Sequence, residues 1–120
     1  MPAALRVEVF VADLDATVDF YVRVLRFTLA RDERADGYVA LHRDGVRVGA
    51  ARRGLLADVA VRRPPSGVEL VLDVDDLDAE VTHVLREGWP LEEPVTQRSW
   101  GLRDARLLDP DGYYWRLTTP

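Results

Sequence analysis

The sequence predicts an α+β protein built of two similar modules, each a strand, a helix and then further strands. Residues 6–23 align with residues 69–86 at a constant offset of 63, and seven of the 18 aligned positions are identical. Each aligned segment has the pattern of an alternating strand followed by an amphipathic helix, and each module later contains an Asp-Gly pair that enters a strand-like run. These observations predict two βαβββ repeats, about 1–54 and 66–120, within a single domain of 120 residues.

The first module opens with a strand over residues 6–11, whose valines alternate with Arg6, Glu8 and Phe10. Asp13 is in position to cap the next helix, because its carboxylate can accept hydrogen bonds from N–H groups of the first turn. The Asp44-Gly45 pair predicts a hairpin between strands at 38–43 and 46–52. Apolar residues at helical spacing predict one buried stripe: Leu14, Val18, Tyr21, Val22 and Leu25.

The second module repeats this order after a turn-rich linker at residues 62–67. A strand at 69–74 precedes Asp76, which stands at the matching cap position, and Gly88 and Pro90 end the helix. A short strand within 91–98 leads to a hairpin between 103–108 and 113–118. The predicted helical stripe consists of Leu77, Val81, Val84 and Leu85. Helices would cover one face of a mostly antiparallel sheet, and the other face would carry Arg6, Glu8, Glu69, Tyr114 and Arg116.

Composition excludes several classes of function. The chain has 21 acidic and 16 basic residues, a net charge of −5, which argues against binding to nucleic acid or anionic membranes, since phosphates attract basic surfaces. The absence of cysteine excludes disulfides, zinc–thiolate sites and a cysteine nucleophile. No apolar run approaches the roughly 20 residues that span a bilayer. The first residues lack the pattern of a signal peptide, so we expect a cytoplasmic protein.

Two segments give the chain a family resemblance. Residues 10–21, Phe-Val-Ala-Asp-Leu-Asp-Ala-Thr-Val-Asp-Phe-Tyr, resemble the first strand and helix of the vicinal-oxygen-chelate superfamily. Residues 108–117, Leu-Asp-Pro-Asp-Gly-Tyr-Tyr-Trp-Arg-Leu, resemble its closing segment. This superfamily includes glyoxalase I, extradiol dioxygenases, fosfomycin-resistance enzymes and bleomycin-resistance proteins. The resemblance implies paired βαβββ modules that form an incomplete barrel around a cavity, with the helices outside, and a homodimer.

The same resemblance bears on metal binding. Metal-using members carry four His, Glu or Gln ligands, two on the first strands and two on the last strands of the modules. By this resemblance, the first-strand ligand positions correspond to Arg6 and Glu69 in this chain. One last-strand position corresponds to Arg116, and the other corresponds to Gly49 or to Ala50. Only Glu69 can bind a metal, and the guanidiniums oppose a cation, although Glu8 could substitute if the strand register shifts by two. We therefore expect no metal, no cofactor and no catalytic residue, a pattern closest to metal-free bleomycin-resistance-like members.

The same charges and the aromatic residues predict a ligand-binding face. Trp100-Gly101-x-Arg103 resembles a stretch of bleomycin-resistance-type members, and a tryptophan in a glycine-flanked loop can stack on a flat ligand. The charges either form cross-strand ion pairs that fill the barrel, or line a cavity in which an arginine holds a carboxylate, phosphate or polarised carbonyl. The predicted ligand-binding residues are Arg6, Glu8, Phe10, His42, Glu69, Trp100, Arg103, Tyr114 and Arg116.

The predicted function is therefore metal-independent binding of a small molecule, of the glyoxalase/bleomycin-resistance type, with an aromatic or cationic antibiotic as the sequestered ligand. The net charge of −5 suits a cationic ligand. Two alternatives stay open. A metal-dependent lyase, isomerase or dioxygenase with an atypical ligand set needs an ion near Glu69. A non-catalytic module closed by salt bridges predicts the lack of any concave pocket of roughly 300 Å³ or more.

Overall fold

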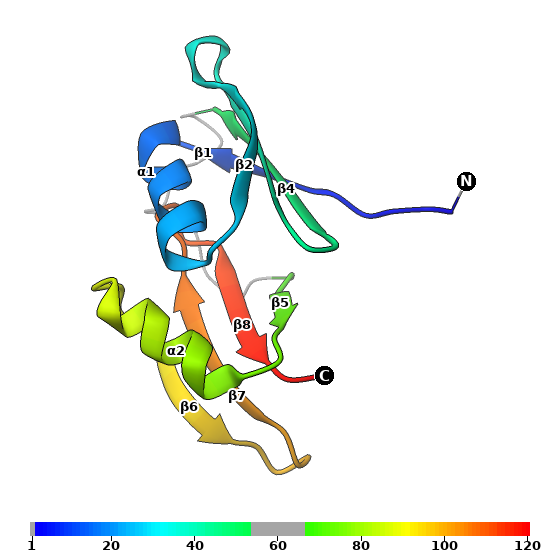
Figure 1. Ribbon diagram of the computed structural model, residues 1–120, viewed down its shortest axis with the longest axis vertical. Helices are drawn as coiled ribbons and strands as arrows, with labels where there is room; N and C mark the ends of the chain where they lie inside the picture. Colours follow the sequence, from blue (N-terminus) through cyan, green and yellow to red (C-terminus); the bar gives the residue numbers. More distant parts are fainter. Residues whose placement is uncertain (1, 54–66) are drawn as a thin grey trace. The chain divides into compact units, whose positions relative to one another are not determined.

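The computed structural model describes residues 2–53 and 67–120 (Figure 1). The chain divides into two compact units, Met1–Val59 and Ala60–Pro120. Each unit contains one open four-stranded sheet and one helical segment, which confirms the predicted α+β fold class. The predicted linker at 62–67 lies, except for its last residue, outside the described residues.

The first unit consists of β1 (Val7–Val11), α1 (Leu14–Asp19), the π-helical turn η1 (Phe20–Val24), β2 (Thr28–Glu33), the 3-10 turn η2 (Arg34–Asp36), β3 (Tyr38–Arg43) and β4 (Val46–Arg52). The strand order is β1-β4-β3-β2, with β1 parallel to β4 and the other pairs antiparallel. The hairpin strands at 38–43 and 46–52 are confirmed. Sequence patterning did not locate β2, because its residues are exposed or half-buried and do not alternate.

The second unit consists of β5 (Leu70–Asp73), α2 (Leu77–Arg86), β6 (Glu93–Gln97), β7 (Arg103–Leu108) and β8 (Tyr114–Thr118). The strand order is β5-β8-β7-β6, again with the first and last strands parallel and the other pairs antiparallel. In Figure 1 α2 lies against this sheet. Three residues of the predicted stripe of α2 are buried, whereas Leu85 is exposed. The three buried residues are Leu77, Val81 and Val84.

Both helices begin at the predicted caps. The Asp13 carboxylate accepts hydrogen bonds from the backbone N–H groups of Asp15 (2.9 Å) and Ala16 (3.3 Å). The Asp76 carboxylate accepts one from Ala79 (3.0 Å). Each cap satisfies N–H groups that the first turn of a helix cannot pair internally, and so fixes where the chain leaves the first strand of its sheet.

The buried face of the first helical segment is rotated from the predicted stripe. Val18 is half-buried and Val22 is 38% exposed, whereas Phe20 and Val24 are fully buried. The π-helical turn explains the difference: the N–H of Leu25 donates to the carbonyl of Phe20 (3.1 Å), five residues earlier, which adds a residue to that turn. The residues of the predicted stripe that are buried are Leu14, Tyr21 and Leu25.

Candidate ligand-binding site

The sheet of the second unit has one apolar and one charged face. Arg106 lies opposite Arg116 in the β7–β8 register, and Asp104 lies opposite Thr118, so strand alternation puts these side chains on one face. Tyr114 shares that face, as predicted, and Trp115 is buried on the other face, under the helix. The charged face is the part of this unit that could recognise a polar ligand.

Six charged side chains form what we call the second-sheet cluster. Arg116 Nε lies 3.0 Å from Glu69 Oε1, and Arg106 Nη1 lies 3.7 Å from Glu69 Oε2. The Arg116–Glu69 contact lacks the alignment of a hydrogen bond and is an ion pair only. The members of the cluster, three of each sign, are Glu69, Glu93, Arg98, Asp104, Arg106 and Arg116.

Asp104 is the buried centre of this cluster, with 1% of its side chain exposed. Arg98 Nε donates a hydrogen bond of 2.9 Å to Asp104 Oδ1 and also pairs with Glu93. Asp104 Oδ2 lies 3.8 Å from Arg106 Nη2 and 3.9 Å from Arg116 Nη1. Among the described residues, Asp104 Oδ2 and the Nε atoms of both arginines have no hydrogen-bond partner. The cluster is therefore neutral overall but incompletely hydrogen-bonded.

Tyr114 stabilises the cation of Arg106. Arg106 Nη1 donates to the Tyr114 hydroxyl (3.3 Å), and its guanidinium carbon lies 5.8 Å from the centre of the tyrosine ring. This hydrogen bond raises the pKa of Arg106, with smaller contributions in the same direction from Glu69 and Asp104. Arg106 therefore stays charged under all ordinary conditions.

The sheet of the first unit carries a smaller polar group on its corresponding face. Glu8 pairs with Arg6 Nε (2.9 Å) and accepts a hydrogen bond from the Tyr38 hydroxyl (3.0 Å). Burial, and then the hydrogen bond to Glu8, raise the pKa of Tyr38. Gly49 lies opposite Glu8 in the β1–β4 register, which places Gly49 rather than Ala50 on the polar face. A Cβ at position 49 would lie 2.1 Å from Glu8 Oε2 and 2.2 Å from the Tyr38 hydroxyl, so the ends of these two side chains would have to move to admit any larger residue.

Replacing Gly49 by alanine is expected to lower the free energy of unfolding by about 1 kcal/mol, because the new methyl group must displace the ends of the Glu8 and Tyr38 side chains, which can move but would lose their hydrogen bond. Urea denaturation followed by circular dichroism measures the change. Gly45→Ala is the matched control, since a Cβ at that position meets no described atom within 4 Å. Equal stabilities of the two variants would contradict the close packing at Gly49.

The two other predicted residues of the first unit also lie on its polar face. Phe10 is exposed, and the Arg53 guanidinium carbon lies 5.6 Å from the centre of its ring. His42 is exposed and lies between Thr28 and Arg47 in the sheet register. Arg6, Glu8, Phe10 and His42 therefore belong to one face, on which Arg6 and Glu8 form an ion pair.

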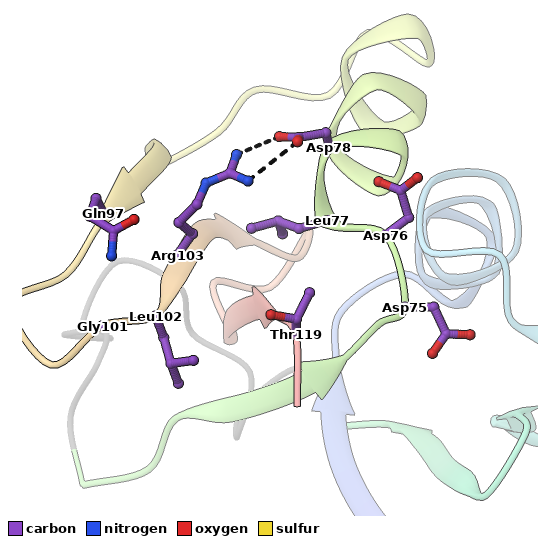
Figure 2. A pocket seen from close by; sticks show the side chains of 9 residues that line it. All are labelled: Asp75, Asp76, Leu77, Asp78, Gln97, Gly101, Leu102, Arg103 and Thr119. Atoms are coloured by element: carbon purple, nitrogen blue, oxygen red, sulfur yellow. Dashed lines mark hydrogen bonds and ion pairs between the residues drawn. The ribbon is translucent and has the colours of Figure 1, made fainter.

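Arg103 lies apart from the other predicted residues of the second unit. It precedes Asp104 on β7, so alternation directs it to the opposite face from Arg116. There its guanidinium forms two hydrogen bonds with Asp78 (2.6 and 3.3 Å), which lower the pKa of Asp78 (Figure 2). Trp100 is exposed in the turn before β7. Arg103 and Asp78 line a pocket of about 360 Å³ at the start of α2, together with Asp75, Asp76, Leu77, Gln97, Gly101, Leu102 and Thr119.

Four residues of the polar faces were missed from sequence: Tyr38, Arg98, Asp104 and Arg106. For two of them a signal was present. Asp104 and Arg106 alternate with the apolar Ala105 and Leu107 along β7, so extending the alternation of the last hairpin places them beside Arg116. Tyr38 and Arg98 had no such signal, because their partners come from other strands.

The residues at the expected metal positions do not fit a divalent cation. Arg6 and Arg116 are permanent cations, and Gly49 offers no donor, while the Glu8 carboxylate takes the space beside it. Within residues 2–53 and 67–120, no group of three or more His, Cys, Asp or Glu side chains is placed to hold a metal ion.

Comparison with known proteins identifies the superfamily of the chain. The model of the Glyoxalase/Bleomycin resistance protein/Dioxygenase superfamily matches residues 4–117, so the chain belongs to this superfamily. TioX from Micromonospora sp. ML1 is a similar solved structure, with 26% sequence identity, a TM-score of 0.80 and 98% of each chain covered. A bleomycin resistance determinant encoded on the transposon Tn5 has 25% identity and a TM-score of 0.78, again with 98% of each chain covered.

A glyoxalase/bleomycin resistance protein/dioxygenase from Alicyclobacillus acidocaldarius shares the fold at 18% identity, with a TM-score of 0.81 and coverage of 98% of this chain and 90% of that one. The comparison with curated proteins finds no match. In the described part of the chain, every helix is too short or too polar to cross a membrane.

Proposed function

We propose that this chain is a metal-independent binding protein that sequesters a small aromatic or cationic organic molecule. One observation carries the proposal. Three of the four positions at which metal-using relatives hold their ion are Arg6, Gly49 and Arg116, and the structure fills the space beside Gly49 with Glu8. The polar faces keep partly exposed arginines, carboxylates and a phenol, which suit recognition of a polar ligand better than metal chemistry.

Similarity to a bleomycin resistance determinant supports a binding function of this kind. An exposed tryptophan in the β6–β7 turn supports stacking on a flat ligand, since a tryptophan ring offers a large rigid surface. The proposal includes a cytoplasmic homodimer, as the family resemblance and the absence of cysteine suggest. The dimer is tested by measuring the mass of the purified protein in solution.

The function is tested by metal content and ligand binding on one preparation. The protein is produced with nickel, zinc, manganese and iron supplied, and purified without an affinity tag or chelator. We expect far less than one metal ion per chain. We also expect a saturable change in tryptophan fluorescence with a bleomycin-type glycopeptide, because the ligand should cover Trp100.

Measured by titration calorimetry, which does not depend on the fluorescence of Trp100, Trp100→Ala should weaken that binding by roughly tenfold if the stacking contact is worth about 1–1.5 kcal/mol. Leu102→Ala, in the same turn, removes an exposed apolar side chain without the ring and serves as the control. Stoichiometric metal that is lost in Glu69→Ala would overturn metal independence. A flat glycopeptide isotherm at high micromolar concentration would exclude that ligand.

A further inference from the structure

The second-sheet cluster places two cations side by side. Arg106 and Arg116 are directly opposite each other across β7 and β8. Like charges at opposed sheet positions destabilise a sheet unless anions compensate them. Glu69 provides the nearest compensation, because its two oxygens lie 3.0 Å from Arg116 and 3.7 Å from Arg106.

The other carboxylates of the cluster are engaged elsewhere. Arg98 pairs with both Asp104 and Glu93, and its hydrogen bond takes Asp104 Oδ1. Asp104 Oδ2 lies 3.8 Å or more from the guanidiniums of Arg106 and Arg116. Among the described residues, the Nε of each of these two arginines lacks a hydrogen-bond acceptor. These Nε atoms are buried, so Glu69 and Asp104 leave the pair incompletely hydrogen-bonded, and a ligand would reach it from the solvent-exposed part of the side chains.

This pair can be reached by a ligand. The side chains of Glu69 and Arg116 are 26% and 25% exposed, so the carboxylate that bridges the arginines borders solvent. Val71 lies opposite Arg116 in the β5–β8 register and is 42% exposed on the same face. An exposed apolar side chain beside paired guanidiniums suits a molecule that carries an acidic group on an apolar body.

We propose that Arg106 and Arg116 form a receptor for the carboxylate or phosphate group of a small apolar acid, and that Glu69 occupies this receptor in the ligand-free protein. Guanidiniums match the geometry of these anions, which can accept two parallel hydrogen bonds. The inference rests on the proposed function, since it assigns a ligand class to the same polar face. It narrows the aromatic or cationic ligand of that proposal to an aromatic acid, because two guanidiniums lie side by side on this face.

Titration with three matched probes tests the receptor. Benzoate and phenyl phosphate distinguish the two acids, and benzamide has the size of benzoate without its charge. Binding is followed by chemical shifts of the backbone amides in the full chain. We expect millimolar affinity of the wild type for one of the acids, as befits a fragment of this size, and at least tenfold weaker binding of benzamide.

Substitutions identify which side chains bind the acid. Glu69→Gln should bind the acid about tenfold more tightly, because it removes the competing carboxylate, and Arg116→Gln should bind it about tenfold more weakly. Glu92→Gln and Arg86→Gln make the same charge changes at exposed positions of this unit and should leave the affinity within twofold of the wild type. Arg106→Gln replaces Arg116→Gln if the latter fails to give a folded protein by circular dichroism.

Binding of benzamide as tight as that of the better-binding acid would overturn the receptor, and so would a lack of binding of both acids. So would a Glu69→Gln variant that binds no more tightly than Glu92→Gln, or an Arg86→Gln variant as weak as Arg116→Gln. These outcomes are distinct from failure of the proposed function. Stoichiometric metal would overturn metal independence even if the acid bound, and glycopeptide binding without acid binding would leave the proposed function standing and remove the receptor.

Discussion

Replacing Asp104 by asparagine is expected to lower the free energy of unfolding by about 3–5 kcal/mol, the usual cost of removing one partner from a buried ionic cluster. Asparagine keeps the size of the side chain but removes the charge that compensates Arg98 and lies within 4 Å of Arg106 and Arg116. The guanidiniums of Arg98, Arg106 and Arg116 would then have Glu69 and Glu93 as the remaining carboxylates of the cluster. Urea denaturation of the full chain, followed by circular dichroism, measures the change.

Asp78→Asn is the matched control for this experiment. Asp78 also pairs with an arginine, Arg103, but its side chain is exposed, so solvent screens the pair. The control should unfold at nearly the same urea concentration as the wild type. If both variants lost the same stability, the effect of Asp104 would come from removing any acidic residue, and burial of the cluster centre would have no energetic consequence.

Alternation along strands predicted part of the candidate site. It placed Tyr114 with Arg116 on the polar face and Trp115 in the core, and the structure agrees. Arg103 was predicted to bind the ligand because the Trp-Gly-x-Arg stretch resembles a family motif. Its odd position on β7 directs it to the helix side instead, where it pairs with Asp78. Arg103 and Arg116 therefore lie on opposite faces of the sheet, because side-chain direction along a strand has a period of two.

The significance of Gly49 could not be derived from the sequence. From the sequence, Gly49 was interpreted only as a position that lacks a metal ligand. In the structure it is the neighbour that leaves room for Glu8 and Tyr38, which come from β1 and β3. A contact among three strands depends on how the strands are aligned in the sheet. Local periodicity predicts the faces of one strand but does not predict its alignment with strands that are distant in sequence.

In the fold, too, local patterns were predicted well and contacts between distant segments were not. The hairpin strands were predicted to within a residue because an Asp-Gly turn fixes where each strand must end. The buried face of the first helical segment was predicted only in part, because a regular period of 3.6 was assumed through residues 20–24. The π-helical turn breaks that period, and it is accompanied by edge-to-face packing of Tyr21 against both Phe20 and Phe27. Phe27 lies beyond the helix, so the helical pattern alone carries no sign of it.

This rotation of the buried face leads to a second large expected effect. Phe20→Ala should lower the free energy of unfolding by about 3–5 kcal/mol, because the ring is fully buried and packs 4.9 Å from the centre of Tyr21. Val22→Ala should change it by no more than about 0.5 kcal/mol, since Val22 is largely on the surface. The stripe predicted from sequence requires the opposite order, with Val22 inside and Phe20 outside. Urea denaturation of the two variants therefore decides between a regular helix and the π-helical turn, and a larger loss in Val22→Ala would show that the regular period holds in solution.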